Sequence, residues 1–224
     1  MSSVAFHLHT DDPRVQSLSI ADPRMGALIA LIGEVKTNTQ EPHFASIARS
    51  IISQQISVKA AATIRRRVVE LAGELSPAAL SAQTDEKLRS AGLSTAKVAY
   101  IRDLCNKVLA GEVNLEQLHQ LSDEEAAAKL VSIKGIGKWT AEMFLIFGLG
   151  RENIMSYGDA GLQRAAKWLH QLDERKDRKY LQQVSHLWAP YSSIASTYLW
   201  EAINQGHVDS GETLSQRMSN SQSV

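Results

Sequence analysis

The stretch LVSIKGIGKWTAEMFLIF, residues 130–147, is the most informative part of the sequence about the fold. Glycines at positions 135 and 137 separate two segments whose apolar residues recur every three or four positions, a period typical of helices. Glycine adopts the backbone angles that a tight turn needs, and its missing side chain lets another part of the chain approach closely. The sequence therefore predicts a helical hairpin over 123–147, with helices at Asp123–Ser132 and Lys138–Phe147.

This hairpin predicts an anion-binding site at the start of its second helix. Main-chain N–H groups and the helix dipole together favour a phosphate there. Lys134 and Lys138 would add attraction to a phosphate without reading any base. A turn whose glycines serve packing alone is the alternative, and a bare Gly-X-Gly favours that alternative. The residues assigned to the phosphate-binding hairpin are Lys134, Gly135, Ile136, Gly137, Lys138 and Thr140.

The helical period continues along nearly the whole chain, so the sequence predicts an all-α protein. Ser122 with Glu125 forms a capping-box pattern, and Ser94 and Ser76-Pro77 mark other helix starts. Further helices are expected at 25–35, 43–54, 58–71, 84–91, 94–109, 114–119, 160–170, 177–188 and 194–203. Residues 1–208 are expected to form the folded domain, and because no linker divides it, any lobes would be interleaved along the sequence. Residues 209–224 are polar and are expected to form a disordered tail.

The composition narrows the classes of function. Basic and acidic residues number 24 each, so any affinity for DNA must come from a local face. The single cysteine, Cys105, excludes an internal disulfide framework and a four-cysteine Fe–S cluster. The sequence lacks a secretory signal and a long apolar run, which predicts a soluble intracellular protein with no membrane partner.

Four segments in this order resemble the helix-hairpin-helix DNA glycosylase superfamily, with the branch of 3-methyladenine DNA glycosylases as the nearest. They are SIARSIISQQISVKAA, AGLSTAKVAYIRDL, the hairpin stretch and WAPYSSIASTYLW, and together they span about residues 43–203. The resemblance implies two helical lobes with an active-site cleft between them. It also implies a monomer that acts on double-stranded DNA containing damaged bases, in the cytoplasm or nucleoid of a prokaryote or the nucleus of a eukaryote.

By this resemblance, Asp159 matches the catalytic aspartate of the family. A fixed carboxylate stabilises the positive charge that develops on the sugar as the N-glycosidic bond breaks, and it could also orient the attacking water. The alternative is a simple N-cap of the helix that follows, and both roles can hold together. Lyase-competent relatives carry a lysine where this chain has Trp139, so the resemblance implies hydrolysis without strand cleavage.

The resemblance also assigns a lesion pocket to Trp139 and Trp200, because an indole face attracts a cationic alkylated base. Met143 lies one helical turn after Trp139, so it is expected to face the same side and to contact the base. The wedge that fills the gap left by a flipped base is assigned to Gln55, with Gln54 and Ile56 beside it. Tryptophans packed in the core and a polar loop at 54–55 are the alternatives that the residues alone favour.

No cofactor is expected to be required. In this family the hairpin commonly binds a monovalent cation, K⁺ or Na⁺, through main-chain carbonyls, which here would be those of Val131, Ile133 and Ile136.

Three departures from the family pattern, at Gly158, Ala160 and Ser192, bear on activity. Three hypotheses therefore stand at this point: a glycosylase for alkylated purines such as 3-methyladenine and 7-methylguanine, a lesion-binding protein with weak or lost catalysis, and a glycosylase for another damaged base.

Overall fold

The computed structural model describes residues 4–38, 44–172 and 179–221, and most of these residues are helical. The chain divides into two compact units, each of which is described by itself. The hairpin unit is the continuous segment up to Leu149, and the terminal unit combines the two ends of the chain. Among the described residues, no helix has the length and apolar composition needed to cross a membrane.

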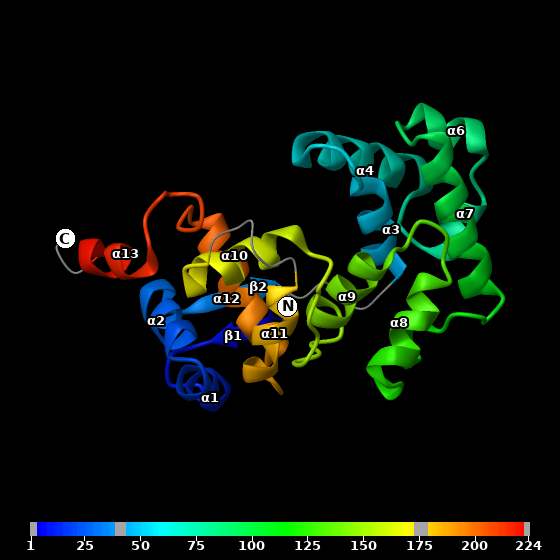
Figure 1. Cartoon of the computed structure of the whole chain (residues 1–224). Coiled ribbons are helices and arrows are strands. Elements are labelled where there is room, and N and C mark those ends of the chain that lie inside the picture. Colours follow the sequence, from blue (N-terminus) through cyan, green and yellow to red (C-terminus); the bar gives the residue numbers. More distant parts are fainter. Residues whose placement is uncertain (1–3, 39–43, 173–178, 222–224) are drawn as a thin grey trace. The chain divides into compact units, whose positions relative to one another are not determined.

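The hairpin unit consists of short helices connected by tight turns (Figure 1). Helices α3 and α7 pack against each other, and α8 packs against α9 as the predicted hairpin. The elements are α3 Phe44–Ser53, α4 Val58–Ala72, α5 Pro77–Ser81, α6 Asp85–Ser90, α7 Thr95–Leu109, η1 Leu115–Gln120, α8 Asp123–Val131 and α9 Lys138–Phe147.

The helix starts in this unit agree with the capping residues in the sequence. Ser122 and Glu125 form both hydrogen bonds of a capping box at α8. Ser94 caps α7, and Ser76 caps α5 with Pro77 in its first turn. Each cap satisfies an N–H group that the helix itself leaves unpaired. The expected helix at 43–54 is confirmed as α3, although His43 lies outside the described residues.

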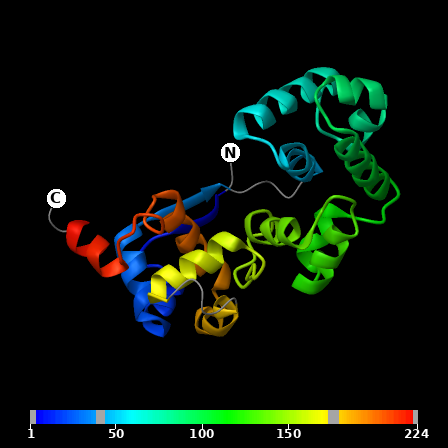
Figure 2. The same ribbon diagram turned by 45° about the horizontal axis from the view of Figure 1, so that its top comes forward.

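The terminal unit surrounds α12, whose residues from Ser192 to Leu199 are all buried. Helices α2 and α10 pack on it, and a pair of antiparallel strands completes the unit (Figure 2). The elements are β1 Val4–Leu8, α1 Pro13–Ala21, α2 Pro23–Ile32, β2 Val35–Asn38, α10 Ala160–His170, α11 Tyr180–Val184, η2 Ser185–Trp188, α12 Ser192–Asn204 and α13 Leu214–Ser221.

Asp22 joins several elements of the terminal unit from a buried position. Its carboxylate caps α2 and accepts hydrogen bonds from the Trp188 indole at 2.9 Å and from His170 Nε2 at 3.2 Å. Burial alone would raise the pKa of Asp22, but the hydrogen bonds from His170 and Trp188 lower it to about 2. The ionised carboxylate therefore stabilises the contact of α2 with α10 and η2.

The two strands correct part of the all-α prediction. Val35 was expected to end a helix, but α2 stops at Ile32 and Val35 lies in β2. Phe6 and Leu8 lie on either side of the exposed His7 in β1 and are both buried. The strands are too short for a clear period, and β1 is stabilised by a partner about 30 residues away, which a local pattern does not reveal. Helix α1 was also not anticipated.

The prediction of a disordered tail is wrong over the helix α13. This helix packs on α2, and Leu214 is buried. The segment before it is held by the Trp168 indole, which donates to the main-chain oxygen of Glu212 at 2.9 Å. Specific tertiary contacts thus order a segment whose own apolar content is low. Residues 222–224, and residues 177–178 of the expected helix 177–188, lie outside the described residues.

Candidate functional site

The turn between α8 and α9 requires glycine at position 135. Gly135 has φ +82°, and a Cβ atom there would lie 2.2 Å from Cδ2 of Tyr100. The turn is closed by the Ile136 N–H, which donates to the Ile133 carbonyl at 3.0 Å. Gly135 therefore serves both the backbone conformation and the packing of the hairpin on α7.

The start of α9 is the part of the hairpin best suited to an anion. Its N-cap is Gly137, which forms no side-chain hydrogen bond to the first turn. The first N–H groups of a helix have no partner within the helix, and the dipole adds positive potential there. The Lys134 N–H, in contrast, donates to Asp103 Oδ2 at 2.8 Å. A phosphate would therefore lie at the first turn of α9, with the Lys138 side chain, which is 81% exposed, nearby.

A second turn, between α3 and α4, carries the residues assigned to the wedge. Gln55 has φ +55°, a strained conformation for a residue other than glycine, and its side chain is exposed. Ile56 is also exposed at 36%. The two side chains therefore stand at the surface of the hairpin unit.

Gln54 was assigned to the wedge beside Gln55, but its side chain is directed to the hairpin. Its side-chain amide donates to the Gly135 carbonyl at 2.8 Å, so it braces the wedge turn against the hairpin. The Lys97 ammonium makes a similar contact with the Ile52 carbonyl at 2.7 Å, and burial lowers the pKa of Lys97. Both contacts satisfy main-chain oxygens at turns, where helical partners are missing.

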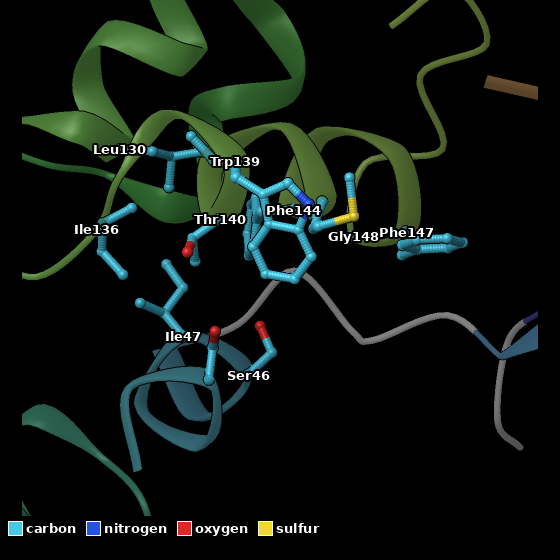
Figure 3. Close-up of a pocket in the computed structure, with 12 residues that line it drawn as sticks. Ser46, Ile47, Leu130, Ile136, Trp139, Thr140, Phe144, Phe147 and Gly148 are labelled. Atoms are coloured by element: carbon cyan, nitrogen blue, oxygen red, sulfur yellow. The ribbon is translucent and has the colours of Figure 1, made fainter. Parts of the chain in front are cut away.

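An apolar cavity of about 280 Å³ lies next to Trp139 in the hairpin unit (Figure 3). Trp139 is in the first turn of α9 and is 52% exposed, which is unusual for an indole that serves only the core. Met143 lies one turn further along α9 and lines the same cavity. The structure therefore brings these two predicted pocket residues together. The cavity is lined by Ser46, Ile47, Ser50, Leu130, Ile136, Trp139, Thr140, Ala141, Met143, Phe144, Phe147 and Gly148.

A polar groove of about 570 Å³ adjoins this cavity, because Trp139 and Thr140 line both. Gln54 and Gln55 line the groove together with the cationic side chains of Arg49 and Arg65. The wedge turn, the start of α9 and two arginines thus share one surface of the hairpin unit. This local grouping supplies positive charge to a chain whose net charge is zero.

Asp159 lies in the terminal unit as the N-cap of α10. Its Oδ1 accepts the Leu162 N–H at 2.9 Å, which fixes the carboxylate at the helix start. Gly161 permits this placement, because a Cβ there would lie 3.0 Å from Asp159 Oδ1 and 3.2 Å from Cδ1 of Ile203. Asp159 is therefore the N-cap of α10, as the alternative interpretation predicted. This structural role is compatible with a chemical role for the same carboxylate. Trp200 is half-buried in the same unit, on α12, which packs against α10.

The carbonyls of Val131 and Ile133, at the end of α8, fit the chemistry of a monovalent cation. Oxygen donors of this neutral kind suit K⁺ or Na⁺, and the C-terminal end of a helix attracts positive charge. The Ile133 oxygen already accepts the Ile136 N–H but retains a second lone pair. The cation at the carbonyls of Val131, Ile133 and Ile136 stays a prediction.

A comparison with models of protein families shows which family the chain belongs to. The model for the HhH-GPD superfamily of base excision DNA repair proteins matches residues 48–190, which include both turns, Trp139 and Asp159. The chain belongs to this superfamily.

Relatives of this HhH-GPD protein cover most of its length. It is 31% identical to DNA-3-methyladenine glycosylase 1 of Schizosaccharomyces pombe over 82% of this chain and 84% of that one. YfjP of Bacillus subtilis is 35% identical, and the match spans 69% of this chain but only 57% of YfjP.

Two solved structures are also similar to this chain over most of its length. The DNA-3-methyladenine glycosidase of Bacillus halodurans has a TM-score of 0.86 and 39% identity, covering 94% of this chain and 97% of that one. The S. pombe enzyme Mag1, solved in complex with abasic DNA, has a TM-score of 0.73 and 29% identity, covering 84% and 95%.

The three departures from the HhH-GPD pattern have different structural settings. Gly158 has no atom within 4 Å of a built Cβ and no positive φ, so neither packing nor the backbone requires glycine there. Ala160 is exposed at the first position of α10. Ser192 is buried, and its hydroxyl donates to Asn153 Oδ1 at 2.8 Å, so it serves the fold of the terminal unit.

Sequence reasoning missed several residues that shape the site. Tyr100 and Asp103 contact the hairpin turn, and Lys97 contacts the end of α3. All three lie in the segment AGLSTAKVAYIRDL, which resembles the family but suggested no roles by itself. Gly161 could have been identified from the sequence, because a glycine within the first turn of a helix weakens that helix and therefore indicates a close contact.

Proposed function

We propose that this HhH-GPD protein is a monofunctional DNA glycosylase that hydrolyses the N-glycosidic bond of alkylated purines, such as 3-methyladenine and 7-methylguanine, in double-stranded DNA. The observation that carries the proposal is Trp139, a half-exposed indole beside an apolar cavity at the start of the DNA-binding hairpin helix. The names of its relatives, which include DNA-3-methyladenine glycosylases from bacteria and yeasts, support the same activity.

The cavity suits the base of a flipped nucleotide. Enzymes that act on a base within a duplex extrude it and stack it on aromatic or apolar side chains. A purine alkylated at N3 or N7 is cationic, and the face of the Trp139 indole attracts it more strongly than a neutral base. Met143 adds a polarisable apolar contact in the same cavity.

Asp159 supplies the charge for bond cleavage. The bond to an alkylated purine is already weak, so the main requirement is to stabilise the positive charge that develops on the deoxyribose. The N-cap hydrogen bond to Leu162 and the close packing of Gly161 hold the carboxylate in one position. The same carboxylate orients the water that attacks the sugar.

The hairpin unit holds the DNA strand. A phosphate binds at the first turn of α9, and Arg49 and Arg65 attract neighbouring phosphates along the polar groove. Gln55 enters the stack in place of the flipped nucleotide. A K⁺ or Na⁺ ion bound by the carbonyls of Val131, Ile133 and Ile136 would add positive charge beside that phosphate. The protein works as a monomer in the compartment that contains the DNA.

Strand cleavage is not part of the proposed reaction. Trp139 carries no amine that could attack the sugar and form a Schiff base. The nearest lysine in sequence, Lys138, has its Nζ 3.9 Å from Glu142 Oε1. The product is therefore a free base and an intact strand with an abasic site.

The test is the release of free bases from DNA treated with a methylating agent, measured by mass spectrometry. The wild-type protein should release 3-methyladenine and 7-methylguanine. Asp159→Asn keeps the N-cap oxygen but removes the charge, so it should lower the rate at least about 100-fold. Asp11→Asn, at an exposed aspartate of the terminal unit, is the control for the loss of one carboxylate and should release bases at the wild-type rate.

Two outcomes would overturn the proposal. Release by Asp159→Asn at the wild-type rate would remove the carboxylate from the mechanism. Tight binding of methylated DNA by the wild type, with no base released, would make the chain a lesion-binding protein.

A separate experiment tests whether Trp139 binds the damaged base. Trp139→Ala removes the stacking surface, and we expect release of cationic 7-methylguanine to fall about tenfold, in line with a desolvated cation–π contact of roughly 1–2 kcal/mol. Trp139→Phe should recover part of this rate because a phenyl ring keeps a weaker π face. Equal rates for the Phe and Ala variants would show that the aromatic face does not bind the lesion.

A further inference from the structure

The exposed face of the β1–β2 pair gathers four polar side chains that play no part in the proposed reaction. Leu8 pairs with Val35 and His7 with Lys36 across the strands. Because side chains alternate between the two faces of a strand, Leu8 and Val35 point into the core and are buried. His7, His9, Glu34 and Lys36 are all exposed on the other face.

Three of these side chains lie close enough to share one ion. His7 Nε2 is 2.5 Å from Glu34 Oε1, and His9 Nδ1 is 3.8 Å from Glu34 Oε2. The two imidazole rings are 4.1 Å apart between centroids. Among the described residues, these three form the group of histidine, cysteine and acidic side chains whose ligand atoms all lie within 4.8 Å of one another.

We propose that His7, His9 and Glu34 bind one divalent transition-metal ion of the Zn²⁺ class. Two imidazole nitrogens and one carboxylate oxygen are a ligand set that Zn²⁺ accepts, with water in the fourth position. Ligands about 2.1 Å from zinc in a tetrahedron lie roughly 3.4 Å apart, so small rotations of these exposed side chains complete the geometry. Mg²⁺ and Ca²⁺ prefer oxygen ligands and bind here much more weakly.

Lys36 competes with the metal for Glu34. Its ammonium is 2.7 Å from Glu34 Oε1, so the carboxylate already has a cationic partner. The Lys36 side chain is 61% exposed, which lets it turn into solvent when the metal binds. The lysine therefore weakens metal binding without blocking the site.

Metal binding would fasten the two strands of the terminal unit to each other. A two-stranded sheet has marginal stability by itself. His7 and His9 come from one side of the pair and Glu34 from the other, so a shared ion bridges them. An ion that binds only the folded protein also raises the midpoint of thermal unfolding.

Isothermal titration of ZnCl₂ into the full chain, prepared without a polyhistidine tag, tests the site. We expect one Zn²⁺ per chain for the wild type. His7→Ala, His9→Ala and Glu34→Gln should each weaken binding at least about tenfold. Lys36→Met should tighten binding several-fold, because it removes the competing cation. The matched control is His186→Ala, an exposed histidine of the same unit, which should bind zinc like the wild type.

Cys105 does not complicate this experiment. It is fully buried in the hairpin unit, and burial raises the pKa of its thiol, so it presents no thiolate to the added ion. Thermal unfolding of the same variants gives a second measurement. Zinc should raise the midpoint of the wild type by a few degrees and leave that of the His7→Ala/His9→Ala double variant unchanged.

The proposal fails if the wild type binds no zinc, or if the double variant binds it as tightly as the wild type does. The competition by Lys36 is refuted if Lys36→Met binds zinc no more tightly than the wild type, since Glu34 would then be equally available to the ion with and without the ammonium. Base release is not measured in these experiments, so their outcome is independent of the proposed glycosylase activity.

Discussion

The hairpin turn and the wedge turn of the hairpin unit both place one residue in the left-handed region, but for opposite reasons. At Gly135, with φ +82°, the ring of Tyr100 fills the space that a side chain would need. At Gln55, with φ +55°, the side chain is present and exposed, although this conformation costs roughly 1–2 kcal/mol. Packing explains the glycine. Packing does not explain the strained conformation of Gln55. Because strained residues are concentrated at functional sites, we infer that the Gln55 side chain acts on another molecule.

The two turns are also connected, since the Gln54 side chain donates to the Gly135 carbonyl. Residues 54 and 55 therefore have different environments within one turn. The Gln54 side chain is directed to the hairpin, and the Gln55 side chain is directed to solvent. The differences between the two turns, and between the two glutamines, lead to three substitutions.

The largest effect is expected for Gly135→Ala. The added methyl group would overlap the Tyr100 ring and would also strain the left-handed backbone, so the free energy of unfolding should fall by about 3 kcal/mol. Urea unfolding followed by circular dichroism measures this change. Gly137→Ala is the matched control, because nothing lies within 4 Å of its built Cβ and its φ is −85°.

Removal of the ring should cost less stability once the overlap is present. In the Gly135→Ala background, Tyr100→Ala should destabilise the protein less than it does alone, because it also relieves the overlap. Strictly additive losses would show that backbone strain, rather than the tyrosine, is the reason for glycine at this position.

An intermediate effect is expected for Gln55→Gly. It relieves the strained conformation, so the free energy of unfolding should rise by up to about 1 kcal/mol. Base release from duplex DNA should nevertheless fall about tenfold, because nothing fills the gap left by the flipped base. Release from single-stranded DNA should change little, since no stack has to be held open. Parallel rate measurements on the two substrates check this prediction.

Gln171→Gly is the matched control for the strain. Gln171 has φ +58° at the end of α10 and is exposed, so the substitution should stabilise the protein similarly. Its base release should match that of the wild type. An equal loss of Gln55→Gly activity on both DNA forms would argue against the wedge.

The smallest effect is expected for Gln54→Leu. The loss of one hydrogen bond to the Gly135 carbonyl should lower the free energy of unfolding by about 1 kcal/mol. Base release should fall only a few-fold, equally on duplex and single-stranded DNA, because the change loosens the hairpin and leaves the wedge side chain in place. A loss confined to duplex DNA would instead give Gln54 the wedge role that the sequence predicted. Gln117→Leu, at an exposed glutamine of η1, serves as the control.

Local patterns predicted the parts of this fold that local interactions determine. The capping box of Ser122 and Glu125, the cap at Ser94 and the glycine hairpin all depend on residues within a few positions of each other, and the structure confirms them. The strands β1 and β2 and the helix α13 depend on partners far away in the sequence, and they were missed.

The candidate site divides in the same way. Gly135 was identified from the glycine pattern of the hairpin, and Trp139 and Asp159 were identified from the resemblance to the glycosylase family. Their surroundings were not, since Tyr100 meets Gly135 and Asp103 meets the Lys134 amide from a helix more than 30 residues earlier.

The helical class, the hairpin and the family could be predicted from the sequence, because they follow from periodicity, capping and motif order. Only the tertiary structure showed that Gln54 braces the hairpin while Gln55 faces solvent, that Trp139 adjoins a cavity, and that His7, His9 and Glu34 meet across two strands. Hydrogen bonds, steric overlap and ligand sets depend on distances between side chains, and those distances arise only when segments far apart in the sequence pack together.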